Sequence, residues 1–97
     1  MYAIAVASQV QIDKIDEAAS IFQDSVVPAY SKLNGFKSAQ LLIDPATGKS
    51  LGISLWESEA DRAAVQNSGA LQEQLAKFAM LLVAPPVPNT YEVKVQV

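Results

Sequence analysis

The spacing of apolar and polar residues predicts four strands. Over residues 2–10, apolar side chains alternate with small or polar ones, a period of two that predicts a strand with both faces partly buried. Residues 36–44 and 51–56 predict the second and third strands, and the Pro- and Gly-containing segment 44–49 is typical of the loop of an antiparallel hairpin. Alternation returns over residues 91–97, where we expect the last strand.

The first helix is predicted between the first two strands. Its apolar residues recur every three or four positions from Ile15 to Leu33, which places them along one stripe of a helix. Asp13 is expected to cap its N-terminus, and Gly35 is expected to end it. Pro28 interrupts the stripe, so we expect a kink or an early end there, because proline removes one backbone hydrogen bond.

The second helical region is predicted between the third and fourth strands. Ser58 is expected as its N-cap, with Asp61 three residues later completing an approximate capping box. The segment 67–69, Asn-Ser-Gly, is expected to break the region. A further helix with apolar residues from Leu71 to Leu82 is then expected to run until the two prolines at 85–86.

The resulting order, βαββαβ, predicts an α+β, ferredoxin-like fold formed by a single domain over residues 1–97. Four antiparallel strands form one sheet, and both helical regions cover the same face. The other face is left bare, although the first three strands are apolar on both sides. We therefore expect a homodimer in which a second copy covers that face.

Composition excludes several classes of chemistry. The chain has neither Cys nor His, which removes thiolate nucleophiles, Ser-His-Asp triads and the common zinc and haem ligands, so we expect no metal and no cofactor. Seven basic residues against ten acidic ones give a net charge of -3, so nucleic acid is not expected as a partner.

No membrane partner is expected. Residues 1–8 imitate the core of a secretory signal but lack a basic start, and the apolar run 79–87 is broken by prolines and is shorter than the about 20 residues of a membrane span. The expected location is cytoplasmic.

Two carboxylates offer a first candidate for chemistry. Glu57 and Asp61 lie about one helical turn apart, a spacing from which two carboxylates can share a proton or hold a divalent cation. Acidic residues at a helix start are also favoured by capping and by the helix dipole, which is the simpler interpretation.

A second set of candidates would bind an aromatic or apolar ligand. The only Trp ends a central strand, where its ring can form a pocket wall, and aromatic residues on the helical stripes can line the same space; packing in the core is the alternative for all of them. The only Arg can fix an oxyanion or lie solvated on its helix, and three neutral residues can donate hydrogen bonds. The substrate-binding candidates are Trp56, Tyr30, Phe22, Phe78, Gln40, Ser54, Arg62 and Asn67; no catalytic residue is identified.

Three stretches resemble the antibiotic biosynthesis monooxygenase family: 35–44, then Thr47-Gly48, then 55–63 with its Leu-Trp-Glu-Ser start. The resemblance implies a dimeric α+β barrel with a mostly apolar pocket in each subunit. Some members oxidise polycyclic phenols, anthrones or quinols with dioxygen and without metal or flavin, and others degrade haem.

One departure from the family narrows these activities. Family members often carry a His roughly where Val65 stands here, which haem-degrading members use as an iron ligand, so haem degradation is not expected. The leading hypothesis is a cofactor-independent monooxygenase acting on a planar phenolic or quinol substrate. The alternatives are a non-catalytic small-molecule-binding or stress-associated protein of the same fold, and a module whose dimer surface is its function.

Overall fold

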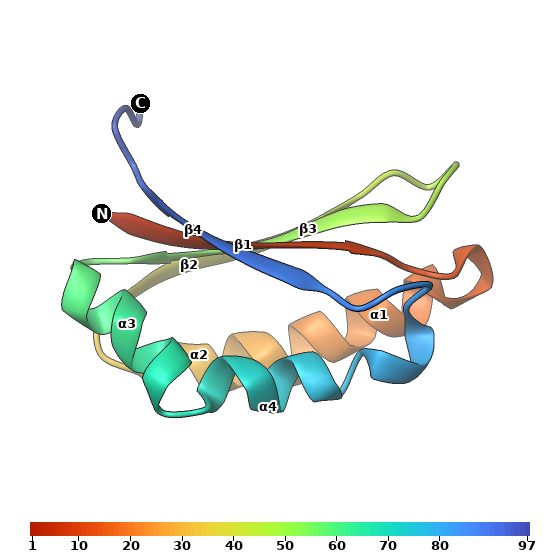
Figure 1. Ribbon diagram of the computed structural model, residues 1–97, viewed down its shortest axis with the longest axis horizontal. Helices are drawn as coiled ribbons and strands as arrows, with labels where there is room; N and C mark the ends of the chain where they lie inside the picture. The colour runs from red at the N-terminus through yellow and green to blue at the C-terminus, as the bar shows by residue number, and fades with distance from the viewer.

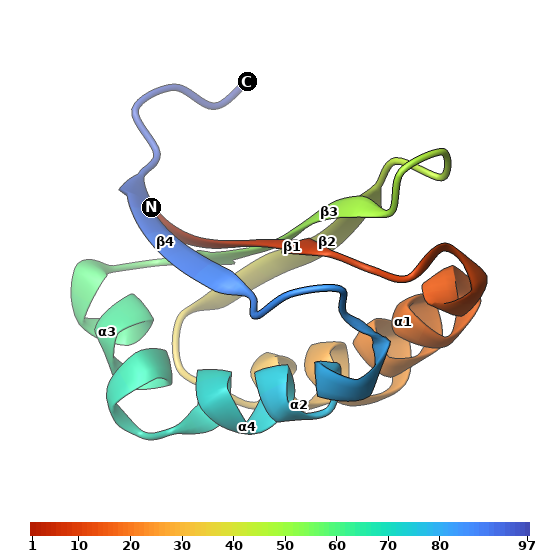
Figure 2. The same cartoon turned by 45° about the vertical axis from the view of Figure 1, so that its right-hand side comes forward.

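A single sheet with helices on one of its faces makes up the computed structural model, which describes all 97 residues (Figures 1 and 2). The strand order is β2-β3-β1-β4 and every neighbouring pair is antiparallel, the arrangement expected of a ferredoxin-like α+β fold. The strands are β1 (Tyr2–Gln9), β2 (Phe36–Ile43), β3 (Lys49–Trp56) and β4 (Val87–Glu92).

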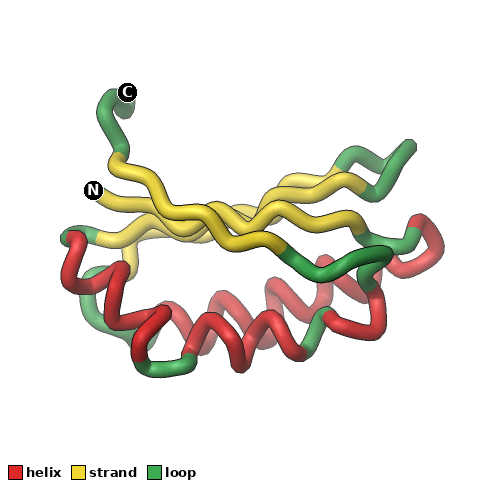
Figure 3. The backbone as a smooth tube through the Cα atoms, in the orientation of Figure 1, coloured by secondary structure: helices red, strands yellow, loops and turns green.

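The helices form the second layer, below the sheet in Figure 3. One helical region follows β1 and the other follows β3, the two central strands, and both pack on the same face of the sheet, as predicted (Figure 3). The segments are a 3-10 turn η1 (Ile12–Lys14), α1 (Ile15–Ile21), a π-helical segment η2 (Phe22–Val26), α2 (Val27–Ser31), α3 (Glu59–Asn67), α4 (Ala70–Ala76) and a second 3-10 turn η3 (Ala79–Leu81).

The interruption predicted at Pro28 takes the form of a π-helical turn. In η2 the Val27 N–H donates to the carbonyl of Phe22, five residues back, and Pro28 follows in the first turn of α2. The wider turn relieves the clash between a proline ring and the preceding turn, so helical structure continues to Ser31 without a break. The predicted Asp13 cap is wrong, because Asp13 lies inside η1 and α1 begins after Lys14 without a side-chain cap.

The cap predicted for the second helical region is confirmed. The Ser58 hydroxyl accepts a hydrogen bond from the Asp61 backbone N–H at 3.1 Å and donates to the Asp61 carboxylate at 2.9 Å. Gly69, with φ of 86°, separates α3 from α4, as the sequence predicted. The expected continuation of the last helix to Leu82 is wrong: α4 ends at Ala76, and Leu82 is extended and bridges to Val10.

The last strand begins and ends earlier than predicted. β4 covers Val87–Glu92, and residues 93–97 continue as a tail on the side of the sheet away from the helices (Figure 1). The partner strand explains this, because β1 starts at Tyr2 and the hydrogen bond from Val93 N–H to the Met1 carbonyl is the last one available. Pro88 is tolerated because β4 is an edge strand.

The two faces of the sheet have different environments. The inner face packs on the helices, and its buried residues form the main core with Ile4, Trp56 and Val65 each at most 2% exposed. The outer face is bare, and Leu42, Leu51, Val87 and Tyr91 on it remain 41–57% exposed. None of the helices is long and apolar enough to cross a bilayer.

Candidate ligand-binding cavity

A cavity of about 60 Å³ lies between the sheet and the helices. Apolar residues supply 13 of the 19 residues that line it. They come from β1, β2, β3, both helical regions and the segment that leads into β4, so both layers of the molecule contribute to the cavity. An apolar cavity with a few convergent polar groups is the usual form of a small-molecule site.

Small residues on β3 make room for the cavity. Ser50, Gly52 and Ser54 follow one another along the inner face of the strand and all line the cavity. At Gly52, the nearest atom to an added Cβ would be Phe22 Cε2 from the helical layer, at an ordinary contact distance of 3.7 Å, so the position has room for one more carbon but not for a large side chain unless Phe22 moves. The small side chains therefore leave a gap beneath the sheet that larger residues would close.

Every polar group at the cavity is uncharged. The Ser8 and Ser50 hydroxyls are hydrogen-bonded to each other at 2.6 Å. Ser54 Oγ accepts from Trp56 Nε1 at 2.9 Å, and the Gln74 Oε1 atom accepts from the Ser25 hydroxyl at 2.8 Å. Because no Asp, Glu, Lys or Arg lines the cavity, a neutral ligand is favoured over an ionised one, which would lose its hydration without a counter-charge.

Tyr30 is the only titratable residue of the cavity wall. It is 4% exposed, and its burial raises the pKa of the phenol from 10.0 to about 12 because the phenolate would be desolvated. No protein group is hydrogen-bonded to the Tyr30 hydroxyl. Every side-chain polar atom that is fully sealed from solvent has a hydrogen-bond partner, so the Tyr30 hydroxyl is not sealed. At neutral pH Tyr30 is thus a protonated hydrogen-bond donor and not a base.

Four of the residues predicted from the sequence line the cavity: Phe22, Tyr30, Ser54 and Phe78. Trp56 is next to them but lies in the packed core, fully buried, with its ring edge-to-face against Tyr30 at 5.5 Å and against Phe36 at 5.6 Å. It holds the cavity wall in place without lining it.

The other three predicted residues lie elsewhere. Gln40 is exposed on the outer face of the sheet, opposite Ile53. Arg62 donates to the Gln66 amide oxygen at 2.6 Å along α3, and Asn67 is exposed at the end of that helix. The structure does not bring these three to the cavity, because strand register turns Gln40 outward and α3 packs by another face.

Sequence reasoning missed the residues that shape the cavity. Ser8, Ser50 and Gly52 leave its volume open, and Gln74 supplies its amide. The signal for Ser50 and Gly52 was present: together with Ser54 they place three small residues before the Trp on one strand face, which predicts a gap, whereas Ser8 on β1 stands apart from this pattern. Gln74 carried no such signal, since an isolated Gln in a helix is usually exposed.

The acidic residues at the start of α3 have structural partners. Glu57 pairs with Lys37 at 2.6 Å, and this hydrogen bond and charge lower the pKa of the Glu57 carboxyl. Asp61 is held by Ser58. The two carboxylates therefore point to different partners, and nowhere do three His, Cys, Asp or Glu side chains gather.

Comparison of the sequence with models of known families finds no match, and no curated protein matches it. Solved structures match over nearly the whole chain. A Nitrosomonas europaea protein described provisionally as an antibiotic biosynthesis monooxygenase is 16% identical, with a TM-score of 0.76, covering 98% of this chain and 100% of the other. The Mycobacterium tuberculosis haem degrader MhuD, solved with two haems in its active site, is 20% identical. Its TM-score is 0.75, and the match covers 100% of this chain and 99% of that one.

A third match is a monooxygenase from the Streptomyces coelicolor gene ActVA-Orf6, solved with nanaomycin D: 19% identical, TM-score 0.73, covering 99% of this chain and 89% of that one. Identities this low carry information on fold alone. The chain therefore has the fold of solved antibiotic biosynthesis monooxygenase proteins, as its sequence resemblance implied.

Proposed function

We propose that the cavity binds a small, neutral, planar phenol or quinol and that dioxygen oxidises the bound molecule without a metal or flavin. The observation that carries this proposal is the apolar, uncharged cavity beneath the sheet, in a fold shared with monooxygenases. A site that excludes water and supplies oriented hydrogen-bond donors suits a substrate that reacts with dioxygen by itself.

The volume of the cavity favours a substrate with one aromatic ring. Its 60 Å³ is smaller than the roughly 150 Å³ of an engineered cavity that admits benzene. A ring can enter only if partly buried side chains such as Phe22, Phe78 and Leu82 move apart. Polycyclic substrates would require a much larger displacement.

The proposed reaction needs no external reductant. A phenol with a hydrogen at its para carbon and one dioxygen give the para-quinone and one water. The para C–H and phenol O–H bonds break, one oxygen atom forms the new C=O bond, and the other takes both hydrogens as water. The ring supplies all four electrons. Tyr30 can donate a hydrogen bond to the substrate oxygen, but with a pKa of about 12 it does not take the proton.

Oxygen uptake by the purified, metal-free protein tests this proposal. The panel runs from substituted phenols and hydroquinones through 1-naphthol to anthrone, and we expect uptake above the uncatalysed rate for the one-ring compounds first. Gly52→Val, which fills the cavity, should abolish the excess, whereas Gln72→Ala, an exposed change on α4, should leave it intact. Equal rates with and without protein across the panel would refute catalysis.

A second candidate function is ligand binding without turnover. The observation that favours it is the lack of any charged side chain or side-chain base in the cavity wall, since a phenolate would not be stabilised there. Such a protein should unfold at a higher temperature in the presence of ligand, by mass action, while consuming no oxygen.

We also propose that the protein is a homodimer formed through the outer face of the sheet. One row of that face crosses all four strands through Leu42, Leu51, Ala7 and Val87, and the three larger residues are half exposed. A contiguous apolar row on a bare sheet is typical of an interface.

The dimer is tested by sedimentation velocity. Leu51→Lys places a charge in the centre of the apolar row and should shift the protein to the monomer. Met80→Lys makes the same kind of change at an 87% exposed residue on the helical side and should leave the dimer intact. A wild-type protein that sediments as a monomer at micromolar concentration would overturn the proposal.

A further inference from the structure

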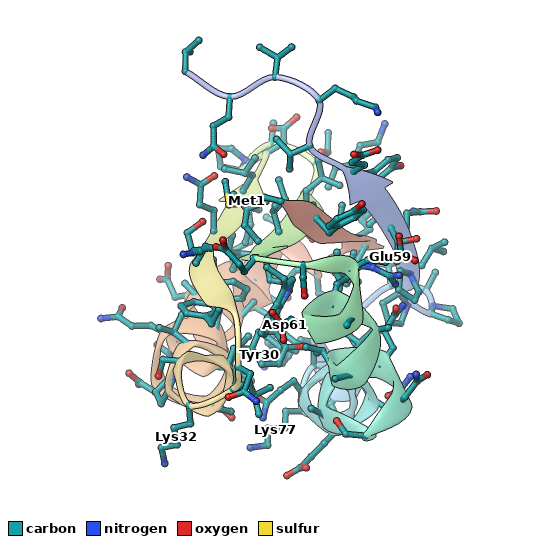
Figure 4. All side chains as sticks on the ribbon, turned by 90° about the vertical axis from the view of Figure 1, so that its left-hand side faces the viewer. Met1, Tyr30, Lys32, Glu59, Asp61 and Lys77 are labelled. Carbon is teal, nitrogen blue, oxygen red and sulfur yellow. The ribbon has the colours of Figure 1, made fainter.

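A chain of hydrogen bonds connects the protein surface to the cavity. Lys77 Nζ donates to Ser25 Oγ at 2.6 Å, and Ser25 Oγ donates to Gln74 Oε1 at 2.8 Å. Lys77 is exposed, Ser25 is partly buried on η2, and Gln74 on α4 is only 5% exposed and lines the cavity. Figure 4, which looks along the helices, places Lys77 by the gap between the two helical coils and Tyr30 nearer the sheet.

The chemistry of these groups sets the direction of the chain. An ammonium has three donors and no acceptor, so Ser25 Oγ must accept from Lys77. The Ser25 hydroxyl proton is then free to donate, and Gln74 must present its oxygen to receive it. The opposite orientation of the amide would leave the Ser25 proton without an acceptor. The chain of hydrogen bonds therefore fixes Gln74 Oε1 toward Ser25 and turns Gln74 Nε2 away from it.

The Gln74 Nε2 group has no protein partner. Gln74 is almost fully buried, yet no polar side-chain atom is sealed from solvent without a hydrogen bond. Gln74 lines the cavity, so open space is available to its N–H donors on that side. The Ser54 oxygen accepts from the Trp56 indole, so the Ser54 hydroxyl proton remains available as a further donor at the site.

We propose that Gln74 determines ligand specificity by donating to an acceptor oxygen, such as the carbonyl of a ketone or quinone or the oxygen of a neutral phenol. Ser25 and Lys77 are positioning residues that hold the amide in its donating orientation. This inference rests on the proposed function to the extent that the cavity binds a small aromatic molecule, but it does not require turnover. Burying a ligand without an acceptor leaves the amide unsatisfied, and that penalty is the source of selectivity.

The test compares two probes of nearly equal shape, acetophenone and α-methylstyrene, which differ by an oxygen in place of a methylene group. Dissociation constants are measured by NMR titration of the wild-type protein. We expect acetophenone to bind about 3- to 10-fold more tightly, the ratio that one hydrogen bond contributes. This comparison needs no variant and is unaffected by changes in folding.

Variants assign the preference to the amide. Gln74→Leu should bring the two dissociation constants to within about twofold of each other, mainly by tightening α-methylstyrene binding and weakening that of acetophenone. Gln72→Leu is the matched control, the same change at an exposed position of the same helix, and should keep the wild-type ratio. Ser25→Ala should reduce the ratio while hardly changing the affinity for α-methylstyrene, an effect that general loosening of the helices would not produce.

The outcomes separate this inference from the proposed function. Equal affinities for both probes in the wild-type protein would overturn the role of Gln74 and leave ligand binding in the cavity intact. Saturable binding of neither probe would overturn both. A preserved preference for acetophenone in Gln74→Leu would also overturn the inference, whatever the oxygen-uptake assay shows.

Discussion

The two ends of β3 differ sharply although they lie on the same face of the same strand. At one end, Trp56 is fully buried, in contact with two aromatic rings and close to Val65 in the main core. Toward the other end, Ser50 and Gly52 face the same helical layer and border a cavity. A period of two determines which side chains face the helices, but side-chain volume determines whether that layer is filled.

The comparison shows how one short strand combines stability with a binding site. The filled end gains dispersion contacts and apolar burial, and the open end forgoes them. Ser54 lies between the two: its oxygen satisfies the buried Trp56 indole on one side, and its side chain borders the cavity on the other. The rigid end thus fixes the wall of the open end.

The largest effect is expected at the filled end. Trp56→Ala should lower the free energy of unfolding by about 3 to 5 kcal/mol, because it removes a fully buried ring and leaves a void. Urea denaturation measures the loss, and Trp56→Phe, which keeps one ring, should cost less. A loss below about 1 kcal/mol together with weaker ligand binding would show that Trp56 acts as a cavity wall instead.

Tyr30, between the two ends, should make stability depend on pH in alkaline solution. The pKa of Tyr30 is about 12 in the folded protein, compared with an ordinary value of 10.0. The contribution of the neutral phenol to the free energy of unfolding is therefore fully present below pH 10 and is lost as pH rises toward 12. The loss should be about 2 to 3 kcal/mol. Urea unfolding of the wild type and of Tyr30→Phe between pH 9 and 12 isolates the Tyr30 contribution to this loss of stability, because all other groups titrate in both proteins. Parallel curves would mean that water reaches the phenolate.

The same comparison explains how far the sequence predicts this molecule. The element order and the hairpin followed from hydrophobic period and turn residues, and the Ser58 cap from its side chain, because each is a local property of the chain. The end of β4 did not, since it depends on where β1 begins.

The cavity was less predictable than the fold. Phe22, Tyr30, Ser54 and Phe78 line one cavity, and their shared orientation toward it is readable from the helical stripes and the strand face. Gln40 pointed to the other face because the relative register of two strands is a tertiary property. The chain of hydrogen bonds from Lys77 to Gln74 runs through Ser25, which is 49 positions from Gln74 and 52 positions from Lys77 in the sequence. No local sequence pattern encodes contacts over such separations.

Filling the open end should raise stability and weaken binding together. Gly52→Ala adds a Cβ at an ordinary contact distance of 3.7 Å from Phe22 and should stabilise the protein by about 0.5 to 1 kcal/mol, the usual cost of glycine inside a strand. Acetophenone binding should weaken in the same variant.

Gly69→Ala is the control for this gain. No atom lies within 4 Å of its added Cβ, but φ is 86°, so the substitution should destabilise the protein by about 1 kcal/mol through backbone strain. Thermal unfolding of both variants measures whether stability rises in Gly52→Ala and falls in Gly69→Ala. Stabilisation by Gly69→Ala would contradict the backbone-strain argument, and unchanged acetophenone binding in Gly52→Ala would contradict the placement of the ligand in the space beside Gly52.

The smallest effect is expected just outside the filled end, at the ion pair between Lys37 and Glu57. The Lys37 hydrogen bond and charge depress the pKa of Glu57, so the contribution of the pair is present above the ordinary pKa of a glutamate and is lost as pH falls through the lowered value. Lys37→Met should return the Glu57 pKa to its ordinary range in an NMR titration. Because both side chains are exposed, the unfolding midpoint should barely move, and the remaining difference should vanish in high salt. A large loss of stability would instead mean that charge, and not the packing of Trp56, holds this end of the strand together.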